Sequence, residues 1–128
     1  MQTVNPRISF TIALGVLLLI EGLWGLFSPM VFGVLSTNTF HALIHLALGI
    51  AGIWCGRAAR VRGYLLFVGG LLFAVGLLWF VPGVQEIIVR LLNVNRAVAC
   101  VNVAAGIVAL AVAAPGLGGR ETVKCVRP

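Results

Sequence analysis

The chain has 128 residues, of which 61% are hydrophobic and only 9% are charged, and its mean hydropathy is +1.13. A soluble domain has roughly 25% charged residues, so this composition argues against a soluble domain. The net charge of +6 does not indicate nucleic-acid binding, because the basic residues stand at the ends of apolar runs, where they orient a protein in a membrane.

Four apolar segments follow one another along the chain. We expect transmembrane helices over residues 8–27, 40–56, 63–81 and 97–114, because about 20 apolar residues match the ~30 Å hydrocarbon core of a bilayer. Lipid offers no hydrogen bonds, so every backbone N–H and C=O group must find its partner within a helix or a closed barrel. The sequence lacks the alternation of apolar and polar residues that is typical of barrel strands. The sequence therefore predicts one all-α polytopic membrane domain over residues 1–128.

Two shorter stretches lie between these spans. Residues 84–92 place their apolar side chains on one helical face, directly after Pro82 and Gly83. This stretch is too short to cross a bilayer, so we expect an amphipathic helix along the membrane surface. We expect residues 29–35, after the first span, to form a similar surface helix.

The basic residues predict the orientation of the chain. One side of the membrane would carry Arg90 and Arg96, and the other would carry seven basic residues, which are Arg7, Arg57, Arg60, Arg62, Arg120, Lys124 and Arg127. The positive-inside rule then places both termini and the tail, residues 115–128, in the cytoplasm. The three cysteines, Cys55, Cys100 and Cys125, lack metal-ligand spacing, and we expect no disulfide framework.

The two halves of the chain resemble each other. Residues 35–50 (LSTNTFHALIHLALGI) align with residues 92–107 (LNVNRAVACVNVAAGI) at an offset of 57, which pairs His45 with Asn102. Small residues then follow on one face of each helix, and close backbone approach at such residues holds helices together in lipid. We therefore predict two repeated hairpins of equal orientation, packed through Gly49, Gly52, Gly56, Gly106, Ala109 and Ala113.

The second span opens with Asn38, His41 and His45, followed by Gly49. In this Asn-x-x-His-x-x-x-His motif, and over residues 8–114, the chain resembles a family of bacterial four-helix integral membrane proteins classed as a domain of unknown function. The resemblance implies the fold and a membrane location, for which we expect a bacterial inner or other energy-transducing membrane. That family often has a histidine motif opening its fourth helix, and Asn102 stands in that place here.

Glu21, His45 and Asn102 are expected at similar depth, because each lies seven residues, about 10 Å along a helix, from the same end of its span. An ionised carboxylate at that depth costs several kcal/mol unless it is paired. We therefore expect Glu21 either to be protonated or to find a partner in the bundle, for which His45 and Asn102 are the candidates. Hydrogen bonds between helices are the structural interpretation of this cluster.

Two functional alternatives stay open. Histidines at i and i+4 share a helical face, so His41 and His45 could bind a metal together with Glu21, or one histidine could bind a haem or a chlorophyll-type ring. Movement of protons or small solutes is the second alternative, since ionisable residues within a membrane can mark a relay.

The small-residue faces favour a third interpretation, which we rank first. We expect an accessory or structural subunit that acts through helix packing in a larger membrane complex or in a homo-oligomer. Its partners would be lipid and other membrane subunits or further copies of itself, with no nucleic acid and no cofactor required. No catalytic motif occurs, and we expect no enzyme.

Overall fold

The structure is a computed structural model that describes residues 4–115. In this part the helices are α1 (Pro6–Phe27), α2 (Thr39–Arg57), α3 (Val61–Leu78), α4 (Val84–Leu92) and α5 (Arg96–Ala113), and the strands are β1 (Met30–Val31) and β2 (Leu35–Ser36). α1, α2, α3 and α5 are each long and apolar enough to cross a membrane. Apart from the two short strands, the protein is an all-α integral membrane protein. The predicted tail lies outside the described residues except for Pro115.

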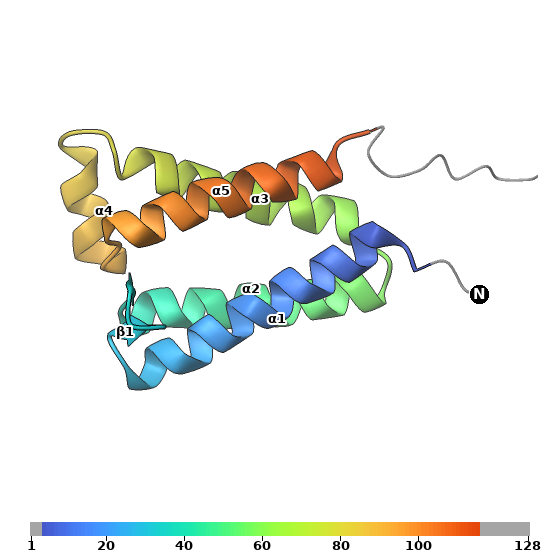
Figure 1. Cartoon of the computed structure of the whole chain (residues 1–128), viewed down its shortest axis with the longest axis horizontal. Helices are drawn as coiled ribbons and strands as arrows, with labels where there is room; N and C mark the ends of the chain where they lie inside the picture. Colours follow the sequence, from blue (N-terminus) through green and yellow to red (C-terminus); the bar gives the residue numbers. More distant parts are fainter. Residues whose placement is uncertain (1–3, 116–128) are drawn as a thin grey trace, which may run out of the picture.

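The helices form two antiparallel pairs (Figure 1). α1 packs against α2, and α3 packs against α5; we call these pairs the first and the second hairpin. α4 lies at the same end of the molecule as β1, and the connection from α2 to α3 lies at the opposite end, on the side of the N-terminus. α4 covers the predicted residues 84–92, whereas α3 begins and ends slightly earlier than the predicted segment.

The connection between α1 and α2 is not the predicted surface helix. β1 and β2 pair antiparallel, with Val31 opposite Leu35. Phe32 and Gly33, at the turn between them, have φ angles of 51° and 73°, and two successive left-handed residues are incompatible with an α-helix. The prediction was wrong because apolar spacing over so short a stretch does not exclude a turn.

α4 is the amphipathic helix predicted from residues 84–92. It begins after Gly83, which has a φ of 85°, and ends at Asn93, which has a φ of 51°. None of its residues is buried, and its apolar side chains Ile87 and Leu91 are more than half exposed. Such an exposed apolar face suits a helix that lies in the surface of a membrane.

Glycines set the distance between α1 and α2. A Cβ added at Gly49 would lie 2.6 Å from the Leu19 nitrogen and 2.7 Å from the Gly15 oxygen, and one at Gly22 would lie 2.7 Å from the Ala42 oxygen. Side chains at these positions would therefore force the backbones apart. The predicted packing residues of α2 are all buried, and they are Gly49, Gly52 and Gly56.

α3 and α5 approach each other in the same way. A Cβ at Gly106 would lie 2.6 Å from the Phe73 nitrogen and 2.8 Å from the Gly69 oxygen, and one at Gly76 would lie 2.7 Å from the Ala99 oxygen. Side chains at these positions would again separate the two helices. The other predicted packing residues of α5 are also buried, and they are Ala109 and Ala113.

The close contacts of the two hairpins correspond position by position. Gly69 and Gly76 have the same spacing along α3 as Gly15 and Gly22 have along α1. Gly106 of α5 aligns with Gly49 of α2 at the offset that relates the two halves of the sequence. The two hairpins thus share one packing arrangement, while a repeat in the sequence itself stays a prediction.

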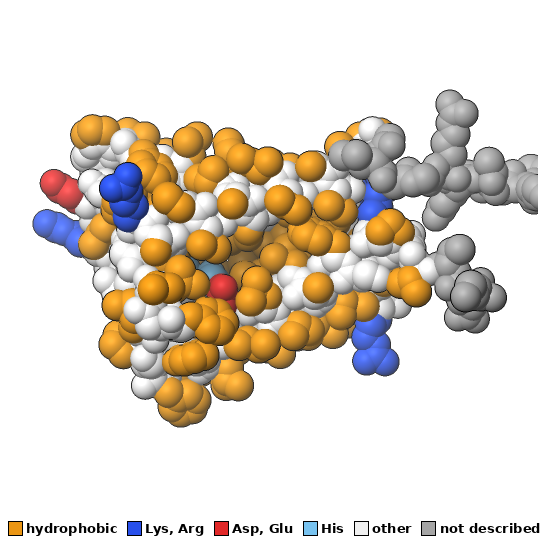
Figure 2. Space-filling view, viewed as in Figure 1, with side chains coloured by type: hydrophobic (Ala, Val, Ile, Leu, Met, Phe, Trp, Pro, Cys, Tyr) orange, Lys and Arg blue, Asp and Glu red, His pale blue; other side chains and the backbone are white. Residues whose placement is uncertain are grey.

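The hairpins meet each other less extensively than their own helices do. α2 and α3 supply most of the helix contacts between them, including a hydrogen bond of 2.7 Å from the Tyr64 hydroxyl to the Leu48 carbonyl. Figure 2 shows a hollow between α1 and α5, with hydrophobic side chains on its walls and a histidine and an acidic side chain at one end.

Two asparagines join the hairpins at that end. The Asn38 Nδ2 donates to the Leu91 carbonyl, and the Asn95 Nδ2 donates to the Val34 carbonyl, both at 2.9 Å. The alignment of the two halves pairs Asn38 with Asn95, and the same offset pairs Val34 with Leu91. The same contact is therefore made twice, as a pseudo-twofold axis between the hairpins requires.

Candidate functional site

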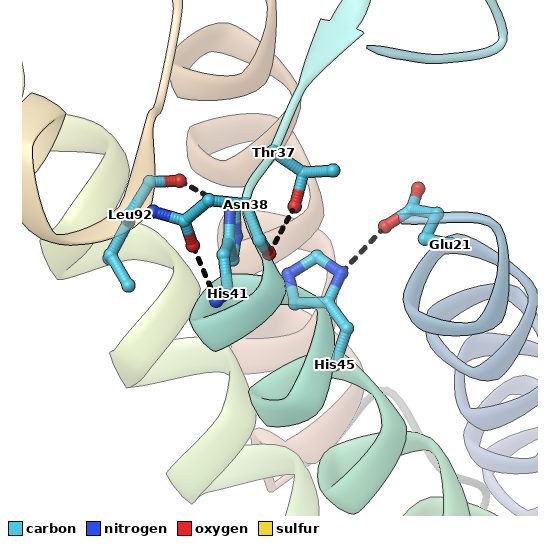
Figure 3. Close-up of polar contacts among 6 residues, drawn as sticks. All are labelled: Glu21, Thr37, Asn38, His41, His45 and Leu92. Carbon is cyan, nitrogen blue, oxygen red and sulfur yellow. Dashed lines mark hydrogen bonds and ion pairs between the residues drawn. The ribbon is translucent and has the colours of Figure 1, made fainter. Parts of the chain in front are cut away.

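The polar residues of the first hairpin meet at the β1 end of the hollow. The Nδ1 of His45 lies 3.0 Å from the Oε2 of Glu21, and the two side chains are 10% and 11% exposed. Figure 3 shows the Glu21 carboxylate reaching from α1 toward the His45 ring on α2. Of the two partners expected for this acid, it is therefore His45 that binds it.

His41 lies one turn away, and its ring has a different partner. Its Nδ1 donates to the Leu92 carbonyl at 2.9 Å, while its backbone N–H donates to the Asn38 Oδ1 at 2.8 Å. The rings of His41 and His45 meet edge to face, with centroids 4.5 Å apart. His41 thus ties α2 to the end of α4 and supports the ring of His45.

The three residues predicted to bind a metal do not converge on one point. His45 directs its Nδ1 to Glu21, whereas His41 directs its Nδ1 to a backbone carbonyl. Within residues 4–115, no group of three His, Cys, Asp or Glu side chains is placed to hold a metal ion. A metal shared by these three residues has no support in this arrangement.

A cavity of about 20 Å³ lies beside the Glu21–His45 pair, and Asn102 of α5 lines it together with both residues. One water needs roughly 10–15 Å³ of such space, so the cavity admits one water-sized group. Asn102 is 5% exposed, and in the described part its side chain makes no hydrogen bond. Its amide is therefore available to a group in the cavity.

A second cavity, of about 70 Å³, lies on the other side of His41, His45 and Asn102. Val75 of α3 lines this cavity. Val75 directly precedes Gly76, just as Glu21 directly precedes Gly22. Val75 therefore occupies the position in the second hairpin that Glu21 has in the first. The remaining lining residues are apolar, namely Ile44, Leu48, Leu71, Leu72 and Leu92. The two cavities are thus pseudo-twofold counterparts, and neither has room for a haem or a chlorophyll-type ring.

Several residues that build this region were not predicted. Gly15, Gly22, Gly69 and Gly76 supply the close approach from α1 and α3. Their signal was the spacing of seven residues between glycines within each span, which puts both on one helical face. Tyr64, a single polar aromatic residue in an apolar span, was also missed.

Comparison with protein-family models, curated proteins and solved structures finds no match to this chain. Membership of the four-helix family that the Asn38 motif resembles therefore stays a prediction.

Proposed function

We propose that this integral membrane protein binds a small ligand, whose polar group is held by Glu21, His45 and Asn102 between the two hairpins. The observation that carries this proposal is a difference between the hairpins. Both pack through glycines at matching positions, yet only the first contains an acid paired with a histidine.

The second hairpin serves as an internal control for the first. At the positions of Glu21 and His45 it has Val75 and Asn102, and no hydrogen bond joins these two residues in the described structure. Its helices nevertheless approach as closely as α1 and α2 do. Packing of a hairpin in this chain therefore does not require the acid–histidine pair.

Energies support the same conclusion. A charged side chain within a membrane costs up to about 3 kcal/mol on insertion scales, whereas one hydrogen bond between membrane helices contributes only about 0.6–2 kcal/mol. A pair such as Glu21 and His45 is thus a poor device for stability. Binding of a ligand gives the Glu21–His45 pair a role, because Val75 at the equivalent position of Glu21 could not bind a polar group.

The double variant Glu21→Val/His45→Asn tests this proposal, because it gives the first hairpin the residues of the second. We expect its free energy of unfolding in detergent to fall by less than about 1 kcal/mol. Native mass spectrometry of protein extracted from its own membrane should show a ligand on the original chain and none on the variant. A variant that fails to accumulate as folded protein would contradict the proposal.

The reverse exchange, Val75→Glu/Asn102→His, is the matched control. If the acid–histidine pair were a packing device, this exchange would stabilise the second hairpin. We expect no gain in stability, because the additional carboxylate must be removed from water without a ligand to compensate.

An accessory role through helix packing is the second candidate. Most of the small residues that suggested it are used inside the hairpins, but a Cβ at Gly63 or Gly70 of α3 would have no neighbouring atom within 4 Å. These two glycines lie seven residues apart on one face and leave room for the helix of another membrane subunit or another copy of the chain. We expect Gly70→Leu to fold normally and to lose the partner or run as a smaller species, as checked by native mass. An unchanged assembly would contradict this role.

The charge distribution supports a position in the membrane for the site. Arg57, Arg60 and Arg62 stand at the α2–α3 connection, so we propose that this end and both termini face the cytoplasm. The Glu21–His45 site then opens near the outer face of a bacterial inner or similar membrane.

A further inference from the structure

The chemistry of the site narrows the class of ligand, and this inference rests on the function proposed above. Three polar groups that line the 20 Å³ cavity have unused hydrogen-bonding capacity. Glu21 contacts His45 through Oε2 only, which leaves its other carboxylate oxygen. When the Nδ1 of His45 donates to Glu21, its Nε2 is an acceptor, and the Asn102 amide offers an oxygen.

The volume limits the polar group of the ligand. A cavity of about 20 Å³ holds one water-sized group, such as a hydroxyl or a primary ammonium. Phosphate, carboxylate and quaternary ammonium groups each have several heavy atoms around their centre and do not fit.

The charge of the lining selects between the two groups that fit. Among residues 4–115, no Lys or Arg lines the cavity, and Glu21 is its one acidic residue. A carboxylate held away from water is stabilised by a nearby cation. A primary ammonium also carries three N–H donors, which match the acceptors on Glu21, His45 and Asn102.

Apolar side chains extend from the cavity along the hollow between α1 and α5 (Figure 2), over a length that suits a hydrocarbon chain. Leu14 and Leu18 lie on the face of α1 that carries Glu21, where they form part of the buried apolar core. The seven residues from Leu14 to Glu21 extend about 10 Å. The hollow in Figure 2 runs between α1 and α5 and has hydrophobic walls.

We propose that the ligand is a single-chain amphiphile with a primary ammonium head, which sits among Glu21, His45 and Asn102 while its chain lies in the apolar hollow between α1 and α5. Phosphatidylethanolamine shares the ammonium head, but its phosphate would find no basic residue in the part of the lining that the structure describes.

Binding to the full-length protein in phosphatidylcholine nanodiscs tests the proposal, with dodecylamine as the probe and thermal stability and native mass spectrometry as readouts. We expect dodecylamine to bind and to raise the unfolding temperature. Glu21→Gln should weaken this binding by about ten- to a hundredfold, which is the usual effect of losing a charge-assisted hydrogen bond. Glu86→Gln, which changes an exposed acid on α4, should leave binding unchanged.

Three further probes make the outcome decisive. Dodecyltrimethylammonium has the same charge without N–H donors, and equally tight binding of this probe would overturn the proposal, because it would show attraction to charge alone. Dodecanoate should not bind. Competition by phosphatidylethanolamine at comparable concentration would also overturn the proposed class of ligand.

The outcomes also separate this proposal from the function on which it rests. If dodecanol bound in a Glu21-dependent way and dodecylamine did not, the site would remain a binding site and the ammonium class would be wrong. If Glu21→Val/His45→Asn prevented folding, the proposed function itself would fail.

Discussion

Single glycines decide how closely the helices of each hairpin approach. Gly49 and Gly106 occupy equivalent positions in α2 and α5, and each meets the backbone of its partner helix with no room for a Cβ. A Cβ added at Gly70 of α3, in contrast, would have no neighbouring atom within 4 Å. The residue type is the same, but its role depends on which face of the helix carries it.

Substitution by alanine should separate these roles. We expect Gly49→Ala and Gly106→Ala each to lower the free energy of unfolding by about 1–3 kcal/mol, because overpacking forces the backbones apart. Gly70→Ala should be neutral or stabilising by up to about 1 kcal/mol, since alanine is the better helix former. Thermal unfolding in detergent measures all three, and equal effects would contradict this assignment. We expect Gly49→Leu or Gly52→Leu to disrupt folding more than His41→Ala does.

At the level of elements, α2 and α5 begin with asparagines that have two functions. The side-chain oxygens of Asn38 and Asn95 cap their own helices, while their side-chain nitrogens donate to carbonyls of the other hairpin. Asn5 caps α1 through its side-chain oxygen, and among the described residues its side-chain nitrogen has no partner. The caps therefore place the start of α2, and with it His41 and His45, relative to the second hairpin.

We expect Asn38→Ala and Asn95→Ala to lower the free energy of unfolding by similar amounts, about 1–3 kcal/mol, because each removes a cap and a hydrogen bond between hairpins. Asn5→Ala is the matched control, and it should cost about 1 kcal/mol or less. Unfolding midpoints of the three variants check this order. A loss at Asn5 as large as the other two would show that the contacts between hairpins contribute little.

At the level of the whole molecule, two hairpins with similar packing enclose an asymmetric interior. The cavity at Glu21 is polar, and its pseudo-twofold counterpart at Val75 is apolar. Both cavities are lined by His41, His45 and Asn102. Packing of the hairpins therefore does not explain Glu21, because the second hairpin packs in the same way with Val75 at the equivalent position.

The orientation in the membrane is a prediction for the whole chain. Reporter domains fused after residue 128 and inserted between α2 and α3 should be active only as cytoplasmic reporters, because the basic residues cluster at that end. A reporter inserted between β1 and β2 should be active only outside. An external C-terminus would contradict the proposed orientation and would place the Glu21 site on the cytoplasmic side.

The sequence alone determined the spans, the amphipathic helix over residues 84–92, the small-residue faces and the two candidate partners of Glu21, of which the structure selected His45. These features depend on local hydropathy, helical periodicity and the cost of an unpaired acid in lipid, and all three can be read along one chain. Only the tertiary structure decided that residues 30–36 form a β-hairpin and that His41 turns to Leu92. It also decided that the glycine faces are used within each hairpin. Those outcomes depend on which segments distant in sequence meet, because a backbone carbonyl or a partner helix becomes available to a side chain only when the fold brings it there.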